Sequence, residues 1–275
     1  MIRIRRRFLT CLAVFALGAL SSRRLAAQEQ SPSHAPSHAP SHAAFDSLLQ
    51  RHVRAGLVDY DAFSMAPTFR AYLNLLAGTD PAPLPRTEQL AFWINAYNAF
   101  TIQQINAHRE RGSIKNINKV GGLISAGGAW KEAMAVIGGA RHTLDQIEHE
   151  RIRPIFREPR VHFALVCAAL GCPPLRSEAY RAADLDAQLE DQAREFLLRS
   201  PAKNRVDVAK STVWLSPIFK WYGKDFGGSD RAMLQALARY FPAGSERDLL
   251  ASGKARIHWT EYDWSLNTVT RETRK

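Results

Sequence analysis

The segment from Thr87 to His108 places the strongest constraint on the fold of this chain. At 3.6 residues per turn, its large apolar side chains cover every face of a helix rather than one stripe. A helix of this kind cannot lie on a surface and must be enclosed by other elements. The sequence therefore predicts a globular domain around one buried central helix, whose apolar residues are Leu90, Phe92, Trp93, Ile94, Tyr97, Phe100, Ile102 and Ile105.

Shorter elements are predicted on both sides of this segment. Periodicity and cap residues indicate helices over Phe45–Val53, Thr68–Leu76, Asp184–Leu198 and Ser229–Phe241, and one beginning at Ser216-Pro217. Strand patterns indicate hairpins over Ala135–Thr143 and Arg205–Leu215, a buried strand over Val161–Cys167 and a last strand over Arg256–Tyr262. Because no strand-helix-strand rhythm repeats, we expect an α+β fold: a single domain with a small antiparallel sheet packed by helices.

A capping box begins a short helix with two candidate functional residues. In Thr143-x-x-Gln146, the threonine side chain can accept a hydrogen bond from the backbone N–H of Gln146. The glutamine side chain can in turn accept one from the backbone N–H of Thr143. Glu148 and His149 follow directly, so this helix is expected to carry both.

Residues 1–27 have the pattern of an export signal. Arginines from Arg3 to Arg7 precede an apolar run from Phe8 to Leu20, and small residues stand before Gln28. The run is shorter than the roughly 20 residues that a spanning helix needs, so no stable transmembrane span is expected. The order Arg-Arg-Arg-Phe-Leu resembles a twin-arginine signal, and a general secretory signal remains open. The expected location is periplasmic or secreted.

Residues 28–44 form a Pro/Ser/His-rich linker with a Pro-Ser-His-Ala repeat. Without apolar periodicity this segment cannot contribute a core. Its histidines, His34, His38 and His42, could bind a transition-metal ion weakly, but a plain spacer is the favoured interpretation. The folded domain is expected over residues 45–275.

The net charge of +11 arises largely in the leader, which contains six arginines and no acid and leaves +5 for the remaining chain. The other lysines and arginines are scattered, without a basic run interleaved with aromatic residues. Nucleic-acid binding is therefore not favoured. The expected partner is an envelope or extracellular ligand.

Several long sequence blocks resemble the family of domains of unknown function called DUF547. They are LAFWINAYNAFTI at 90–102, HTLDQIEHERIR at 142–153, HFALVCAALGCPPL at 162–175, LSPIFKWYGKDF at 215–226 and YDWSLN at 262–267, and VDY at 58–60 fits the family's start. The resemblance covers nearly all of residues 45–267. It implies a protein whose bacterial relatives are commonly exported, without an agreed activity. The family usually has a small polar residue, often serine, where this chain has Gly171.

Cys167 and Cys172 allow two chemistries. In an oxidising compartment such a pair is typical of a disulfide, and a turn at Gly171 could bring the Cα atoms within the roughly 4.4–6.8 Å that a bridge needs. Alternatively, Cys172 precedes a possible helix start at Pro173, where the positive end of the helix would favour a nucleophilic thiolate. A disulfide or an inert thiol is the preferred interpretation for the pair.

A thiol nucleophile needs a nearby base and a group that orients it. His149, next to Glu148, is the leading candidate. His162 begins the run that ends at Cys167, and five strand steps cover about 16 Å, so a structural role is favoured for His162. Asn95 and Asn98 share one helix face and could stabilise an oxyanion or orient a histidine. Holding a neighbouring loop is the commoner task of such amides.

No cofactor or metal is expected, because the sequence lacks His-Glu-x-x-His, Cys-x-x-Cys and a glycine-rich phosphate loop. Aromatic residues crowd the C-terminal third and could line a groove for a sugar or a peptide, although a core role is expected for them. They are Trp214, Trp221, Tyr222, Trp259, Tyr262 and Trp264.

Two functional hypotheses follow. The first is a thiol-dependent hydrolase or transferase acting on an amide or ester, with Cys172 as nucleophile, His149 as base and Asn95 or Asn98 as helpers. The second is a non-catalytic envelope module that binds a ligand and contains a Cys167–Cys172 disulfide.

Overall fold

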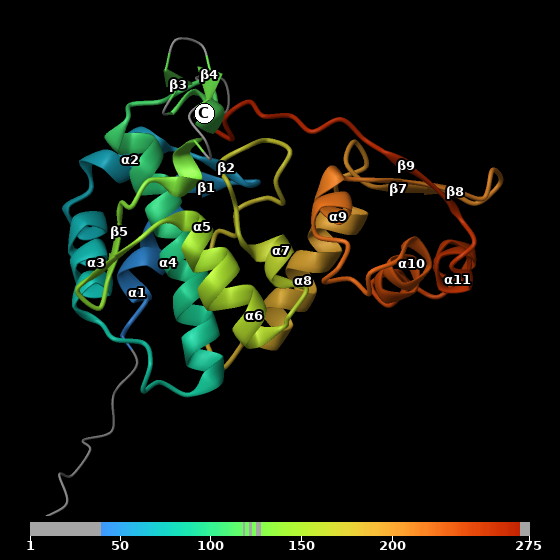
Figure 1. Cartoon of the computed structure of the whole chain (residues 1–275), viewed down its shortest axis with the longest axis horizontal. Coiled ribbons are helices and arrows are strands. Elements are labelled where there is room, and N and C mark those ends of the chain that lie inside the picture. Colours follow the sequence, from blue (N-terminus) through green and yellow to red (C-terminus); the bar gives the residue numbers. More distant parts are fainter. Residues whose placement is uncertain (1–39, 118, 121–122, 125–127, 270–275) are drawn as a thin grey trace, which may run out of the picture. The chain divides into compact units, whose positions relative to one another are not determined.

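Helix α4 (Arg86–Ala107) occupies the centre of the first half of the fold (Figure 1). The computed structural model describes residues 40–117, 119–120, 123–124 and 128–269, all within one compact unit. Side chains on every face of α4 are buried; Ile94, Ala99 and Ile105 have no exposed surface. The buried central helix predicted from the sequence is therefore confirmed. The predicted export signal and most of the linker lie outside the described residues.

The elements around α4 enclose a first hydrophobic core. The N-terminal ones are α1 (Ala43–His52), β1 (Val53–Arg54), β2 (Leu57–Val58), α2 (Tyr60–Met65) and α3 (Pro67–Gly78). After α4 come η1 (Ile114–Asn116), β3 (Lys119–Val120), β4 (Leu123–Ile124), η2 (Gly128–Lys131) and the hairpin β5 (Ala135–Ile137) and β6 (Ala140–His142). Helix α1 begins inside the segment predicted as linker.

A helical segment with one π-helical stretch follows the hairpin. It comprises α5 (Leu144–Gln146), η3 (Ile147–Ile152) and α6 (Arg153–Phe156), and the predicted capping box of Thr143 and Gln146 is present. The backbone N–H of Arg153 reaches the carbonyl of Glu148, five residues back, which is the π pattern. Pro154 contributes, because proline has no N–H for the carbonyl four residues earlier and its ring pushes that carbonyl aside.

The apolar run from Val161 to Cys167 is not a strand. Its first part forms the short helix α7 (Val161–Ala164), and the chain is extended only from Leu165 onward. The prediction of a buried strand was wrong because a short, largely apolar run has the same pattern in a buried helix.

A second hydrophobic core lies in the C-terminal half. Its elements are α8 (Leu185–Leu198), β7 (Arg205–Asp207), β8 (Thr212–Leu215), α9 (Pro217–Trp221), α10 (Asp230–Ala238), α11 (Ser245–Ser252) and β9 (Arg256–Trp259). The sheet order is β7-β8-β9: β7 pairs with β8 antiparallel, as predicted, whereas β9 pairs with β8 in parallel. Helices make up about half of the structure beside sheets of two or three strands, so the α+β class is confirmed, with a mixed rather than wholly antiparallel sheet.

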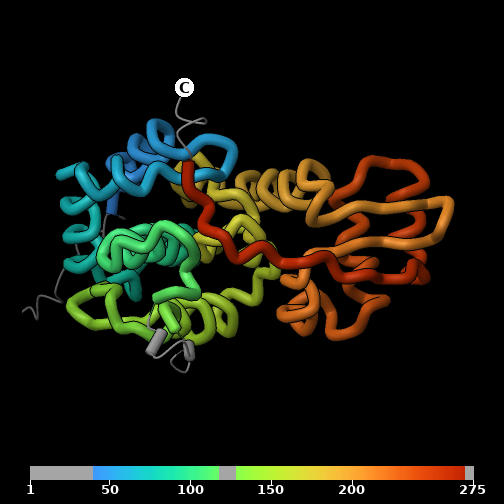
Figure 2. The backbone as a smooth tube through the Cα atoms, turned by 90° about the horizontal axis from the view of Figure 1, so that it is seen from above, coloured from blue at the N-terminus to red at the C-terminus, as the bar shows by residue number. Residues whose placement is uncertain are grey.

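The segment after β9 ties the two halves together. It leaves the three-stranded sheet and runs back across the fold to β2, as the red tube in Figure 2 shows. There Thr268 forms a parallel bridge with Val58, and Leu266 forms an antiparallel bridge with Ala169. The segment around Leu266 is thereby fixed next to the turn between Cys167 and Cys172, although it lies far from that turn in the sequence.

Among the described residues, no helix is long and apolar enough to cross a membrane.

The side chain of Asn98 provides a test of how the central helix holds its surroundings. Its Nδ2 donates to the carbonyl of Ala164 at 2.9 Å, and its Oδ1 accepts the N–H of Val166 at 3.0 Å. Both backbone groups are buried, and an unpaired buried polar group costs roughly 1–3 kcal/mol. Asn98→Ala should lower the free energy of unfolding by about 3 kcal/mol in urea titrations. Gln103→Ala on the same helix is the control; an equal effect of the two variants would contradict this assignment.

Candidate functional site

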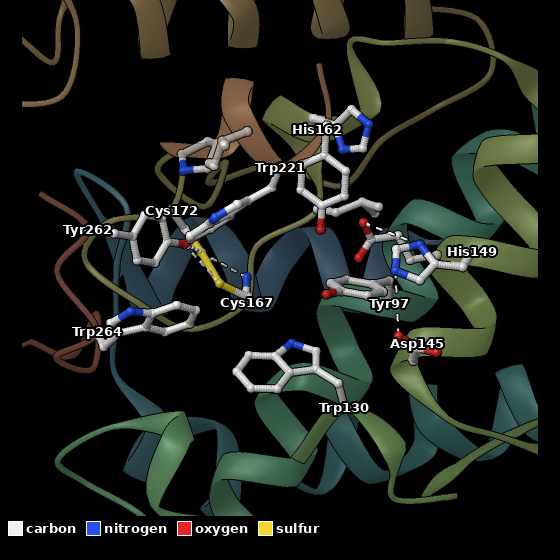
Figure 3. A pocket seen from close by; sticks show the side chains of 15 residues that line it. Tyr97, Trp130, Asp145, His149, His162, Cys167, Cys172, Trp221, Tyr262 and Trp264 are labelled. Atoms are coloured by element: carbon white, nitrogen blue, oxygen red, sulfur yellow. Dashed lines mark hydrogen bonds and ion pairs between the residues drawn. A yellow bond between two sulfur atoms is a disulfide. The ribbon is translucent and has the colours of Figure 1, made fainter. Parts of the chain in front are cut away.

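A cavity of about 210 Å³ opens between the central helix, the π-helical segment and the C-terminal segment. Figure 3 shows its side chains. Aromatic rings form most of the wall, two sulfur atoms lie at one end, and carboxylates and an imidazole lie at the other. The main lining residues are Tyr97, Trp130, Asp145, Glu148, His149, His162, Cys167, Cys172, Trp221, Tyr222, Tyr262 and Trp264.

The aromatic wall is a contiguous cluster. The ring of Tyr262 lies 4.5 Å from that of Trp264 and 4.8 Å from that of Trp221, measured between centroids. Trp130 meets Trp264 edge-on at 6.0 Å. Trp221 is 49% exposed, a large apolar surface of the kind that marks binding sites. The expectation that these rings belong wholly to the core was wrong for Trp221, and the groove alternative describes its position.

Cys167 and Cys172 form one unit in the cavity wall. Their Sγ atoms lie at disulfide distance, with Cα atoms 6.4 Å apart. The backbone N–H of Cys167 points at Cys172 Sγ at 3.1 Å, and the hydroxyl of Tyr262 lies 3.1 Å from Cys172 Sγ and 3.2 Å from Cys167 Sγ. The two sulfurs therefore share a hydroxyl, and Cys172 receives one further N–H.

Backbone hydrogen bonds from the C-terminal segment hold the turn between the cysteines. Leu170 donates its N–H to the carbonyl of Ser265 at 2.8 Å, and Gly171 donates to that of Asp263 at 2.7 Å. A Cβ at position 171 would lie 2.9 Å from three ring atoms of Tyr262, which is too close. The absence of a side chain at Gly171 thus lets the Tyr262 ring pack against the turn.

Lys203 supports the same turn from the other side. Its Nζ donates to the carbonyl of Cys172 at 2.6 Å and lies 5.8 Å from the centroid of the Phe196 ring. Burial lowers the pKa of Lys203 from 10.5 to about 8. A partly buried ammonium group is therefore fixed on the Cys172 side of the pair.

The opposite end of the cavity carries the acid and imidazole groups of the π-helical segment. His149 Nε2 lies 3.5 Å from Asp145 Oδ1, and His149 Nδ1 lies 3.8 Å from Glu148 Oε1. Glu148 is buried, yet it lines the cavity. Burial, followed by the negative charge of Glu148 and its hydrogen bond with the Tyr222 hydroxyl, raises the pKa of Tyr222. That hydroxyl consequently stays protonated and serves as a donor.

Two other cavity tyrosines also keep their protons at neutral pH. Burial, then the negative charge of Glu148, raises the pKa of Tyr97 and that of Tyr262. The Tyr262 hydroxyl facing the sulfurs is therefore available as a hydrogen-bond donor.

His162 faces the cavity but is occupied by a structural network. Its Nε2 lies 2.7 Å from Asp225 Oδ2, and its ring stacks on Tyr222 at 3.9 Å. Arg153 donates Nε–H and Nη2–H to the same carboxylate at 2.7 and 3.1 Å. The hydrogen bond from His162, and then that from Arg153, lowers the pKa of Asp225. These contacts agree with the structural role favoured for His162.

The structure brings four of the six predicted site residues to the cavity: Cys172, His149, His162 and Glu148. It does not bring Cys172 and His149 together; in Figure 3 they lie on opposite sides, with Tyr97 between them. Asn95 lies outside the cavity lining and holds the backbone of Tyr180 through both amide atoms, at 2.7 and 2.9 Å. Asn98 likewise holds the chain that leads to Cys167.

Sequence reasoning missed Asp145, Tyr97, Trp130 and Lys203. The spacing of Asp145 and His149, four residues apart on a helix, could have revealed the first. The sequence pattern identifies Tyr97 only as an apolar residue of the buried central helix. Nothing in the sequence connects Lys203 with Cys172, since that contact arises from the tertiary fold. Among the described side chains, no group of three or more His, Cys, Asp or Glu is placed to hold a metal ion.

The titration of Lys203 provides a pH test of this geometry. Between its lowered pKa of about 8 and the ordinary 10.5, the folded protein binds fewer protons than the unfolded chain. The free energy of unfolding then rises with pH over that range, because the burial penalty disappears as the folded ammonium deprotonates. Relative to Lys203→Met, the native protein should gain stability as the pH rises above about 8, and the difference should be constant at lower pH. Urea titrations across this range measure it; a free energy of unfolding of the native protein, relative to that of Lys203→Met, that stays flat or falls as the pH rises would contradict the burial of Lys203.

Comparisons with known proteins add one finding. Residues 81–197 match the model of the family described as "Protein of unknown function, DUF547". Neither a curated protein nor a solved structure was found that matches the chain. The matched segment contains α4, the π-helical segment and both cysteines. The resemblance noted in the sequence is confirmed over residues 81–197, where the chain matches the DUF547 family model.

Proposed function

We propose that the aromatic cavity is a binding site for a small organic cation and that the protein acts as a binding module. The observation that carries this proposal is the composition of the wall. Six Trp and Tyr side chains line the cavity together with two carboxylates, Asp145 and Glu148. Lys115 lies over the Trp264 ring at 4.9 Å and Arg153 over the Tyr222 ring at 5.0 Å. Among the described residues, the rings without a cation of the protein above them, such as Trp221 and Tyr262, are therefore the ones offered to a ligand.

Aromatic faces and carboxylates favour the same ligand chemistry. The negative face of a Trp or Tyr ring attracts a cation, most strongly where water is excluded. Glu148 is buried at the acid end, so its charge interacts through a medium less polar than water. A ligand with a positive group near Glu148 and an apolar surface against Trp221, Tyr262 and Trp264 would satisfy both parts of the wall.

The cysteine pair fits this function as a wall element. With Cys167 and Cys172 bridged, the turn between them is held covalently as well as by the C-terminal segment. The position of Tyr262, whose hydroxyl contacts both sulfurs, is then fixed before any ligand binds. A preformed site loses less conformational freedom on binding.

A second candidate is a thiol-dependent hydrolase or transferase acting on an amide or ester. It is favoured by one observation: Cys172 Sγ faces the N–H of Cys167 and the hydroxyl of Tyr262, and both donors favour a thiolate. This candidate requires a free Cys172 and hence reduction of the pair. It also requires a base other than His149 in its present position, since His149 lies across the cavity (Figure 3).

Choline and its uncharged isostere 3,3-dimethylbutan-1-ol test the binding proposal by calorimetry on the full chain. Choline should bind with a Kd of about 1 mM or tighter, and the isostere at least about tenfold more weakly, because only choline gains cation–π attraction. Trp221→Ala and Glu148→Gln should each weaken choline binding about tenfold.

Met65→Ala is the matched control, because Met65 is also an exposed apolar side chain, at 76%, and lies outside the cavity. Equal binding of choline and the isostere, or loss of binding in the control variant, would contradict the proposal. So would the absence of any choline binding in this range.

A further inference from the structure

We propose that the Cys167–Cys172 pair is a thiol–disulfide exchange centre in which Cys167 is the sulfur attacked and Cys172 is the leaving group. The inference needs the pair in its bridged form and does not depend on which ligand the aromatic cavity binds.

Access distinguishes the two sulfurs. Both residues line the open cavity, so a thiol that enters it can reach the pair. Cys172 is only 2% exposed, whereas Cys167 is half-buried. Exchange needs an approach to one sulfur along the S–S axis, and the more exposed Cys167 offers it.

Hydrogen-bond donors also distinguish the two sulfurs, and they favour Cys172 as the leaving group. Cys172 Sγ faces two donors, the N–H of Cys167 and the hydroxyl of Tyr262, whereas among the described residues Cys167 Sγ faces only the hydroxyl. The ammonium group of Lys203 also lies on the Cys172 side, on that residue's carbonyl. Negative charge is therefore better stabilised on Cys172, and a thiol with a stabilised anion leaves faster.

The surrounding backbone keeps the pair together when the bond opens. The turn between the cysteines remains bonded to Asp263 and Ser265, and Asn98 continues to hold the chain before Cys167. Cys172 thus stays next to Cys167 and can attack a mixed disulfide there. This proximity makes the bridge re-form as an intramolecular reaction.

The chemistry balances with a small thiol as reductant. A thiolate RS⁻ attacks Cys167 Sγ, a new S–S bond forms, and the electron pair of the broken bond leaves on Cys172 Sγ. A second RS⁻ attacks the RS sulfur of the mixed disulfide, releasing RSSR and the Cys167 thiolate. Two thiols are oxidised, the bridge gains two electrons, and both cysteines take up protons from the thiols; the reverse sequence oxidises the protein with RSSR. The substrate class is therefore a small thiol or cysteinyl peptide, whose thiol end enters the open cavity, and its disulfide.

Glutathione tests this assignment in the full chain carrying Cys11→Ser, so that only the pair supplies thiols. Intact mass should show that reduced glutathione opens the folded native pair and that oxidised glutathione closes it again. Given oxidised glutathione, Cys172→Ser should form a mixed disulfide at Cys167 at least about tenfold faster than Cys167→Ser forms one at Cys172, because the burial of Cys172 blocks the approach of glutathione and outweighs its better-stabilised anion.

Tyr262→Phe removes the shared hydroxyl and retains the ring, so it tests the leaving-group role without emptying the wall. Reduction by glutathione should slow by roughly threefold or more, because each pKa unit on the leaving thiol changes the rate by about that factor. Tyr240→Phe, a buried tyrosine outside the cavity lining, is the control and should react like the parent.

The assignment is overturned if the folded protein resists glutathione and is reduced only after unfolding, which is the behaviour of a purely structural bridge. Equal rates in the two single-cysteine variants would also overturn it, as would an unchanged rate in Tyr262→Phe. Failure of choline to bind leaves all three measurements intact, so this inference and the proposed function fail separately.

Discussion

The hydrogen bonds from the buried amides of α4 to the backbone of its neighbours are the interactions on which the site depends. Asn98 holds the chain at Ala164 and Val166, just before Cys167. On another face of the helix, Gln104 donates to the carbonyl of Ala129, beside Trp130, and Tyr97 itself lines the cavity. Helix α4 thus fixes three parts of the cavity: the end with the cysteines, the wall at Trp130 and the centre at Tyr97. Because buried amides must be paired, these loops cannot shift without a cost in free energy.

The C-terminal segment supplies the second constraint, since it brings Tyr262 and Trp264 to the cysteine turn. Its backbone bonds to Leu170 and Gly171 close the wall, and the missing side chain at Gly171 allows the Tyr262 ring to lie against the turn. The shared hydroxyl therefore results from tertiary structure on both sides. The ring of Tyr262 belongs to the aromatic wall and its hydroxyl contacts both sulfurs, so the proposed ligand site and the proposed exchange centre share this residue.

Much of the local structure could be predicted from the sequence, because periodicity and caps act over a few residues. The apolar segment of α4, the hairpin within Ala135–Thr143 and the capping box at Thr143 were each recognisable from a few neighbouring residues. The helix α7 was not recognisable in this way, since a short, largely apolar run has no period that distinguishes a helix from a strand. Site residues were predictable by chemical type, as with Cys172 and His149. Their separation across the cavity, the contact of Lys203 and the parallel pairing of β9 depend on long-range packing that no local pattern records.

Both the preformed wall and the proposed exchange centre require that Cys167 and Cys172 are bonded to each other. Alkylation of the folded, unreduced full chain, followed by peptide mapping to assign label to Cys11, Cys167 or Cys172, tests this most directly. Cys167 and Cys172 should carry no label before reduction and should both be fully labelled afterwards, at the intact mass of a monomer. Label on either of these two cysteines before reduction would contradict the bond between them and would favour a free catalytic thiol instead.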